Sequence, residues 1–204
     1  MITLIDYGAG NLHNLEGALA RVGLASRRAA TPDQAPDSGI LLLPGVGHFG
    51  AAMGALKASG WAGELPRLAA AGRPLLGICL GIQLLAEGSE ESPRDEGLGL
   101  LPGVVRRLGP GVKVPHMGWS PLRVVAPHPA LPGADGAWLY FVHSYALEPS
   151  PHTLCDAFHG HPFAAIEGRS KVLGFQPHPE KSGLAGLHLL RAILAWMGPE
   201  APCP

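Results

Sequence analysis

The sequence predicts an α/β fold: a doubly wound, mostly parallel sheet with helices on both faces and a mixed or antiparallel extension. Within residues 1–90, continuous apolar runs alternate with stretches in which apolar residues recur at helical spacing. Such runs are typical of parallel strands that are buried on both faces and connected by helices. Over residues 104–176, short strand-like runs follow one another with Gly, Pro and His between them. This second pattern indicates a mixed or antiparallel arrangement of strands.

The amino-terminal part supplies the parallel strands. The apolar run at residues 2–6 predicts the first strand, and helical spacing over residues 12–22 predicts a helix that ends at Gly23. Two further buried strands are expected at residues 39–47 and 73–81, both of which are rich in Leu and end in Gly. The second of these runs directly into another helical stretch, so a strand and a helix should meet there.

The second half of the chain predicts the extension of the sheet and a closing helix. Short strands are expected at residues 104–108, 120–125, 137–147, 153–159, 164–169 and 172–176. The closing helix is expected over residues 182–198, with Ser182 as its N-cap. Its apolar face would consist of Leu184, Leu187, Leu190, Leu194 and Met197. We expect one domain at residues 1–200 and a frayed tail at residues 201–204.

The composition suits a compact domain that binds a small ligand. Of the 204 residues, 47% are hydrophobic and 15% are charged. The formal charge of -1 gives no reason to expect nucleic acid or an anionic membrane as a partner. The first residues lack the regions of a signal peptide, and no apolar run is long enough to span a bilayer. A cytoplasmic location is therefore expected.

Neither a metal nor a cofactor is expected. Cys79, Cys155 and Cys203 are too scattered for a disulfide framework or for a zinc site with paired thiolates. His159 and His161 lie close together in the sequence, but no adjacent carboxylate or thiolate completes a ligand set. Each cysteine therefore has to be considered alone.

Cys79 is the candidate nucleophile. It lies between Gly77 and Gly81 where a buried strand meets a helix, which matches a nucleophile elbow with Cys in place of Ser. At such a turn the backbone is strained, and neighbouring chains come too close for a Cβ. The adjacent helix N-terminus would stabilise a thiolate. A buried structural cysteine is the alternative, which the glycines disfavour; Cys155 and Cys203 have no such turn, and no catalytic role is expected for them.

His178 and Glu180 are the candidate base and its orienting group. They are two residues apart, so on an extended backbone both side chains leave the same face and can meet. Pro177 and Pro179 favour that backbone, because each fixes its own φ and restricts the residue before it. A thiolate nucleophile needs a partner that is itself oriented by a third group. The sequence therefore predicts a triad of Cys79, His178 and Glu180.

Together with PGVG at residues 44–47, these motifs resemble the class I (triad) glutamine amidotransferases. The resemblance implies that glutamine is the substrate, that a γ-glutamyl thioester forms on Cys79, and that ammonia is released. It also implies an oxyanion hole made by the backbone N–H of Leu80 and that of Val46 or Gly47. An anion that forms on a thioester carbonyl requires such donors in place, and the glycines of this turn permit a peptide flip.

A narrower resemblance extends over residues 2–197. The segments DYGAGNLHN, KVPHMGW, YFVHSY and HPEKSG are similar to those of the glutaminase subunits of imidazole glycerol phosphate synthases, which act in histidine biosynthesis. This resemblance implies a heterodimer with a (β/α)8-barrel cyclase subunit, which uses the ammonia to make imidazole glycerol phosphate and an aminoimidazole carboxamide nucleotide. The residues implied to hold glutamine are Gln83 and the backbone of His143, Ser144 and Tyr145. Those implied to face the partner are Asn11, Asn14, Met117, Trp119, Tyr140 and Lys181.

Some positions depart from the family pattern. These are Ser120, where Asn is usual, His48, where a smaller residue is common, and Pro177, where an aromatic residue is usual. The change at Ser120 puts one polar contact at the partner face in doubt. Exposure of Met117, Trp119 and Tyr140 would distinguish an interface from ordinary core packing.

Two other functions remain as alternatives. One is the glutaminase subunit of pyridoxal phosphate synthase, against which KVPHMGW and Lys181 argue. The other is a non-hydrolytic, DJ-1-like protein with an elbow cysteine, which would not need the PHPE segment. The chain has neither a Walker-type phosphate loop nor a dinucleotide fingerprint, so the chemistry that consumes ammonia is expected on another subunit.

Overall fold

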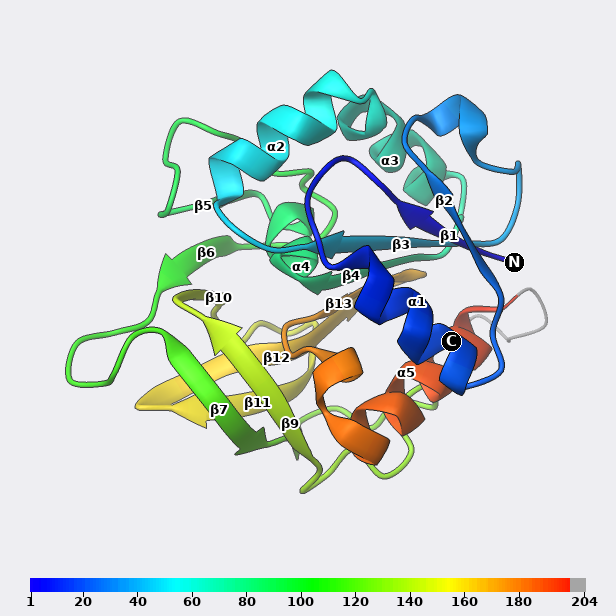
Figure 1. Ribbon diagram of the computed structural model, residues 1–204. Coiled ribbons are helices and arrows are strands. Elements are labelled where there is room, and N and C mark those ends of the chain that lie inside the picture. The colour runs from blue at the N-terminus through cyan, green and yellow to red at the C-terminus, as the bar shows by residue number, and fades with distance from the viewer. Residues whose placement is uncertain (199–204) are drawn as a thin grey trace.

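An eight-stranded sheet crosses the middle of the protein in the computed structural model, which describes residues 1–198 (Figure 1). In order across the sheet the strands are β2 (Ser26–Ala29), β1 (Ile2–Ile5), β3 (Ile40–Gly45), β4 (Leu75–Cys79), β13 (Val172–Phe175), β12 (His161–Arg169), β11 (Thr153–His159) and β8 (Arg123–Val124). Neighbours pair in parallel from β2 to β13 and antiparallel from β13 to β8. The predicted fold class is confirmed.

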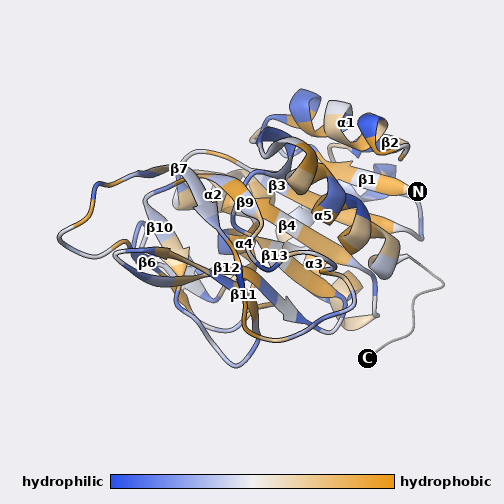
Figure 2. Ribbon diagram, turned by 90° about the horizontal axis from the view of Figure 1, so that it is seen from below, coloured by the Kyte–Doolittle hydropathy of each residue, from blue (hydrophilic) through white to orange (hydrophobic). Residues whose placement is uncertain are grey.

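Helices cover both faces of this sheet (Figure 1). One face carries α1 (Leu12–Arg21) and α5 (Gly183–Met197), and the other carries α2 (Phe49–Ala58), α3 (Trp61–Ala70) and the short α4 (Leu80–Leu85). Because side chains alternate along a strand, Leu42 of β3 packs with the first set of helices, while Leu41 and Leu43 pack with the second. The strands between the helical layers are predominantly hydrophobic (Figure 2). Two short 3-10 turns are η1 (Pro32–Gln34) and η2 (Pro179–Lys181).

Two smaller sheets accompany the main one. One contains β10 (Tyr145–Leu147), β6 (Val104–Arg107) and β5 (Gly88–Ser89), and the other pairs β7 (His116–Pro121) with β9 (Trp138–His143). The prediction of a single strand at residues 137–147 is wrong. The chain leaves β9 after His143 and enters a different sheet at Tyr145. Local sequence does not reveal which partner each half of a strand will pair with.

One other strand prediction needs correction, and two stretches of strand were not predicted. The run expected as one strand at residues 120–125 is divided between the end of β7 and the two-residue β8. The strand β2 was not predicted, because its sequence SRRA has no apolar pattern. The first part of β7 was not predicted either, since Gly118 interrupts its pattern.

The start of α5 differs from the expectation in two ways. Ser182 stands before the helix, but its side chain does not cap it. The hydroxyl instead donates to the His178 carbonyl over 2.6 Å and accepts the Tyr140 N–H over 2.9 Å, so it joins η2 to β9. Leu184 is 81% exposed, whereas the rest of the predicted apolar face is buried.

Within residues 1–198, no helix is long and apolar enough to cross a membrane. Cys203 and the predicted tail at residues 201–204 lie outside the described residues.

Candidate active site

Cys79 lies at a strained turn between a strand and a helix. It ends β4 and directly precedes α4, and its φ of 55° belongs to a region that L side chains rarely adopt. A Cβ on Gly81 would come within 2.0 Å of the Leu43 carbonyl oxygen, and one on Gly77 within 2.7 Å of the Gly81 carbonyl group. Close approach of the backbone therefore requires both glycines, as the elbow motif predicted.

The turn that follows β3 lies beside Cys79. In the parallel ladder of β3 and β4, Gly45 stands opposite Cys79, and a Cβ on Gly45 would meet the Leu80 side chain at 2.8 Å. Gly47 has a φ of 101° and open space around it, so glycine is needed there for its conformation. Val46, between the two glycines, is 44% exposed. The residues predicted to supply oxyanion donors are thus adjacent to the thiol.

A buried tyrosine holds the start of this turn. The Tyr7 hydroxyl donates to the Pro44 carbonyl over 2.8 Å. Burial raises the pKa of Tyr7, and the nearby Cys79 adds to the effect, so the phenol keeps its proton. The hydroxyl therefore remains a donor to the Pro44 carbonyl at neutral pH.

His178 is held by its backbone and oriented by Glu180. Its N–H donates to the Tyr140 carbonyl over 2.9 Å, and its carbonyl accepts from Ser182, so both β9 and the start of α5 fix its position. Its Nδ1 lies 2.8 Å from a carboxylate oxygen of Glu180, in a pair whose side chains are almost fully buried. Because Nδ1 donates to the carboxylate, Nε2 is the nitrogen left for chemistry.

The surroundings of His178 favour its protonated form. Burial by itself lowers the pKa of an imidazole, but contact with Cys79 and Glu180 outweighs burial and raises the pKa of His178 to about 9. Among the described residues, the buried Nε2 has no hydrogen-bond partner of good geometry. Cys79 is thus close enough to influence His178 without being aligned with it, and Nε2 remains free for a substrate atom.

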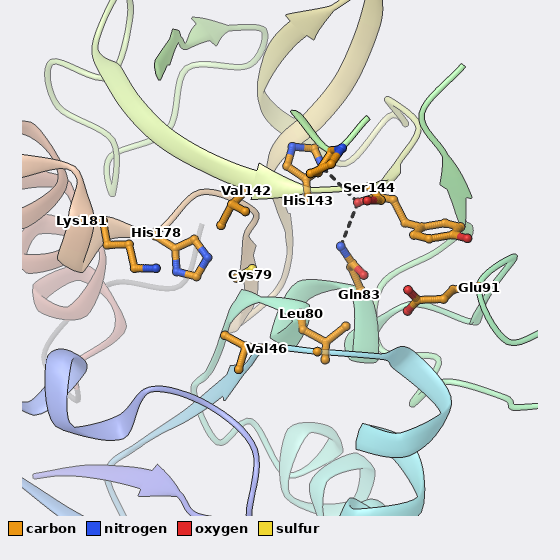
Figure 3. Close-up of a pocket in the computed structure, with 13 residues that line it drawn as sticks. Val46, Cys79, Leu80, Gln83, Glu91, Val142, His143, Ser144, His178 and Lys181 are labelled. Atoms are coloured by element: carbon orange, nitrogen blue, oxygen red, sulfur yellow. Dashed lines mark hydrogen bonds between the residues drawn. The ribbon is translucent and has the colours of Figure 1, made fainter. Parts of the chain in front are cut away.

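Cys79 and His178 line one pocket of about 270 Å³ (Figure 3). The predicted substrate and oxyanion residues that line the same pocket are Val46, Gly47, Leu80, Gln83, His143, Ser144 and Tyr145. The Gln83 amide donates to the Tyr145 carbonyl over 2.9 Å and to the Gln176 side chain over 3.1 Å. The first of these bonds connects α4 with β10, so a helix and a strand of the three-stranded sheet form one wall.

Glu91, Pro115 and Val142 also line the pocket but were not identified from the sequence. Among the described residues, Glu91 is the only acidic side chain in the lining. One of its carboxylate oxygens accepts the Phe49 N–H over 2.7 Å at the start of α2. Glu91 lies in the connection between β5 and β6, where no motif or periodicity marks a functional residue.

The outer face of the β7–β9 ladder is apolar and begins at the pocket. Its cross-strand pairs are Met117 with Val142, Trp119 with Tyr140, and Pro121 with Trp138. Met117, Trp119 and Trp138 are 62%, 50% and 57% exposed, which argues against ordinary core packing. Tyr140 is half-buried, and the Lys181 ammonium lies 6.0 Å from the centre of its ring. We call these six cross-strand residues the outer ladder face.

The other predicted partner residues lie beside this face. Asn11 and Asn14 are exposed at the start of α1, which packs next to η2. The Asn11 side chain accepts the Asn14 N–H over 3.2 Å and so caps α1, which gives Asn11 a role within the chain. Lys181 is exposed in η2 and also lines the pocket. The pocket and the predicted partner surface therefore share a border.

Ser120 does not lie on the partner surface. The sequence put a polar contact with the partner in doubt at this position, and Ser120 is indeed only 8% exposed, with its hydroxyl 3.0 Å from Nε2 of His116. The alternation of β7 explains its place: Met117 and Trp119 point outward, so His116 and Ser120 point inward. Nδ1 of His116 lies 3.1 Å from Nε2 of His143.

Within residues 1–198, no group of three or more His, Cys, Asp or Glu side chains could hold a metal ion. His159 and His161 pair at the ends of β11 and β12, and Nε2 of His159 bonds to the Lys113 carbonyl over 2.8 Å. Burial raises the pKa of Cys155 to about 12, so this cysteine stays a thiol.

The chain has similar proteins over nearly its whole length. Residues 3–194 match the family described as glutamine amidotransferase class-I. Proteins named imidazole glycerol phosphate synthase subunit HisH are 44% identical in Desulfitobacterium hafniense, 45% in Streptococcus gordonii and 43% in Methanothermobacter thermautotrophicus. In that order, these alignments cover 98%, 93% and 94% of this chain and 97%, 93% and 96% of the relatives.

Solved structures share the fold at low sequence identity. The structure of PurLQS from Thermotoga maritima superposes with a TM-score of 0.75 at 20% identity and covers 97% of this chain and 98% of its own. A crystal structure described as a glutamine amidotransferase gives a TM-score of 0.73 at 19% identity and covers 95% of this chain and 98% of its own. At these identities the likeness establishes the fold alone.

Proposed function

We propose that this chain, which belongs to the class I glutamine amidotransferases and among them to the HisH subunits of imidazole glycerol phosphate synthase, hydrolyses glutamine and passes the ammonia to a partner subunit. One arrangement carries the proposal: Cys79 at a strained elbow shares a pocket with His178, which pairs with Glu180. The partner that we propose is a (β/α)8-barrel cyclase, which converts its nucleotide substrate and the ammonia into imidazole glycerol phosphate and an aminoimidazole carboxamide nucleotide.

The first half of the reaction forms a thioester. Because the pKa of His178 is about 9, the imidazole is protonated at neutral pH, and the nucleophile is the thiolate form of Cys79. The thiolate attacks the side-chain amide carbon of glutamine, and the carbonyl oxygen becomes an oxyanion held by N–H groups of Leu80 and of residues 46–47. Nε2 of His178 gives its proton to the amide nitrogen. The C–N bond then breaks, ammonia leaves, and a γ-glutamyl thioester remains on Cys79.

Water completes the cycle. His178, now neutral, takes a proton from a water molecule as the water oxygen attacks the thioester carbon. The C–S bond breaks, Cys79 leaves as a thiolate, and glutamate is released. Glu180 accepts the Nδ1–H of His178 throughout, which keeps Nε2 directed at the reacting atoms and stabilises the imidazolium.

The pocket offers groups that complement glutamine. The carboxylate of Glu91 fits the α-ammonium group, since an acidic side chain that lines a pocket favours a cationic group. The backbone of residues 143–145 and the side chain of Gln83 supply further polar contacts. We therefore add Glu91 to the substrate residues proposed from the sequence.

The partner would dock on the outer ladder face together with Asn11, Asn14 and Lys181. Val142 and Lys181 belong both to the pocket lining and to this surface. A docked partner would thus cover the pocket on one side and exclude bulk water there. Free ammonia is protonated in water, so a covered route keeps it reactive.

The alternatives receive less support. The similar proteins in three organisms are named as subunits of imidazole glycerol phosphate synthase rather than of pyridoxal phosphate synthase. A DJ-1-like protein would have no use for a buried His178–Glu180 pair beside its cysteine. A cytoplasmic location, where the precursors of an amino acid would be found, remains our prediction.

Glutamate release tests the proposal. Its rate is measured for the chain alone, with the barrel cyclase, and with the cyclase and its nucleotide substrate. We expect slow hydrolysis by the chain alone and activation of about 100-fold in the full assembly, the size of effect that one oxyanion donor has. Cys79→Ala should abolish hydrolysis in all three states. Equal rates in all three would indicate a free-standing glutaminase, and no hydrolysis in any would refute the proposal.

A further inference from the structure

A buried row of hydrogen bonds runs from β7 to the glutamine pocket. The Ser120 hydroxyl lies 3.0 Å from Nε2 of His116, whose Nδ1 lies 3.1 Å from Nε2 of His143. Nδ1 of His143 lies 3.0 Å from the Tyr145 carbonyl, which also accepts the Gln83 amide over 2.9 Å (Figure 3). The proposed catalytic steps use none of the Ser120, His116 and His143 side chains.

The carbonyl at one end fixes the direction of every bond in the row. A carbonyl oxygen only accepts, so His143 carries its proton on Nδ1. A neutral imidazole has a single N–H, and Nε2 of His143 therefore accepts a proton that His116 donates from Nδ1. Nε2 of His116 is then an acceptor, and the Ser120 hydroxyl must donate to it. With both rings neutral, this is the proton assignment that satisfies all three bonds.

The surroundings keep both rings neutral and in place. Burial, together with neighbouring imidazoles, lowers the pKa of His116 to about 4 and that of His143 to about 3. His116 stacks on Phe141 with ring centres 5.1 Å apart and on His159 with centres 4.2 Å apart. Dense packing of this kind restricts ring rotation, so the row has one stable arrangement.

We propose that Ser120 and His116 are positioning residues for glutamine binding, because they hold His143 in its Nδ1-protonated form and thereby fix the Tyr145 carbonyl and the Gln83 side chain at the pocket. This inference rests on the proposed function, since it takes glutamine as the ligand of that pocket. Strand β7, which carries Ser120 and His116 on its inner side, also carries outward side chains of the outer ladder face. It therefore supports the pocket from the side on which the partner would dock.

The protonation pattern can be read without any assay of activity. Nitrogen NMR of the full chain, with isotope-labelled histidine, shows which ring nitrogen carries a proton. We expect Nδ1–H and a bare Nε2 for both His116 and His143. Ser120→Ala should shift the His116 Nε2 signal and give a mixture of tautomers at His143, whereas Ser120→Thr keeps the hydroxyl and should keep the pattern. A wild-type His143 protonated on Nε2 would overturn the proposal.

Kinetics of the assembly with the barrel cyclase and its nucleotide test the effect on glutamine. Ser120→Ala and His116→Phe should raise KM about fivefold, roughly the effect of one lost neutral hydrogen bond. The kcat should stay within about twofold, because the row shapes the ground-state pocket. Ser120→Thr should restore the wild-type KM. Thr3→Val is the control, since it removes a buried strand hydroxyl that has no partner among the described residues.

The outcomes separate this inference from the proposed function. An unchanged KM in both Ser120→Ala and His116→Phe contradicts the positioning role, and so does a fall in kcat at constant KM. If the wild-type assembly does not hydrolyse glutamine, the proposed function fails, and the positioning role for glutamine fails with it. The NMR pattern would still show in that case whether the row of hydrogen bonds exists.

Discussion

Cys79 keeps a backbone conformation that would suit glycine better. Its φ is 55°, and a non-glycine residue held in such a region costs on the order of 1–3 kcal/mol. The parallel ladder on one side and α4 on the other leave the chain no alternative path, because Gly77 and Gly81 are already in contact with neighbouring backbone or side chains. The fold therefore maintains strain at the residue that must present its sulfur.

Because of this strain, replacing Cys79 by glycine should stabilise the fold while it abolishes activity. Cys79→Gly relieves the positive φ and should raise the free energy of unfolding by about 1 kcal/mol relative to Cys79→Ala, which keeps it. Both variants lack the thiol and should release no glutamate. Denaturant unfolding of the two variants measures the difference. A glycine variant less stable than the alanine variant would contradict the prediction.

Glu180 should matter less than the residues that touch the substrate. It orients and polarises His178 over 2.8 Å without approaching the thioester carbon. Glu180→Gln should therefore retain measurable turnover, while Cys79→Ala retains none. The comparison is made by glutamate release in the activated assembly. Complete loss in both variants would mean that Glu180 takes part in the chemistry itself.

At the scale of elements, the outer ladder face is the surface to test. Trp119 is 50% exposed and lies near its centre, and central Trp residues are enriched among interface positions whose truncation to Ala costs about 2 kcal/mol or more. Trp119→Ala should then weaken binding of the barrel cyclase by about 30-fold, as measured by calorimetric titration. Phe158→Ala is the matched control, since Phe158 is a 66% exposed aromatic residue on β11, outside the ladder. Equal affinities for both variants would exclude this face.

Some of the strands could be predicted from the sequence and others could not. The central strands were predictable, because burial on both faces gives continuous apolar runs such as that of β3. The edge strand β2 was not, because its exposed residues carry no pattern. The break at Ser144 depends on pairing with two different sheets, which local sequence does not encode.

The site was predictable where a local motif defines it and not elsewhere. Gly77, Gly81 and the two prolines around His178 constrain the backbone locally, so the elbow and the base could be found. Glu91 reaches the pocket only because its loop packs against the start of α2, a contact between distant parts of the chain. The inward direction of Ser120 could not be read from the sequence, because the first part of β7 had not been predicted as a strand.

For the whole molecule, buried histidines should make stability depend on pH in two directions. The pKa of His178 is about 9, above the ordinary 6.5, so the folded chain binds the extra proton and stability falls as pH rises from 6.5 through 9. The pKa values of His116 and His143, about 4 and 3, lie below 6.5. Below pH 6.5 the unfolded chain therefore binds more protons at these two residues than the folded chain does, and stability falls as pH decreases from 6.5 towards 4.

Denaturant unfolding across this pH range checks both windows. His116→Gln keeps a neutral polar side chain and should reduce the acid-side slope by up to about 1 kcal/mol per pH unit, without changing the alkaline side. His178→Gln should do the reverse, because Cys79 and Glu180 would then face a group that does not titrate. An acid-side slope that is the same in His116→Gln and wild type would contradict the assignment.

Gly45 of β3 and Cys79 of β4 stand opposite each other in one parallel ladder. The strand register therefore sets the distance between the nucleophile and the oxyanion turn. One residue inserted into either strand would displace the Cys79 sulfur relative to the turn after β3. It would also move all later side chains in that strand to the opposite face of the sheet. Changes in chain length are therefore confined to the connections, such as residues 108–115 and 125–137, where they leave the ladder intact. The loops beside the outer ladder face can therefore lengthen without disturbing the reaction. The distance between the Cys79 sulfur and the turn after β3 stays fixed by strand register.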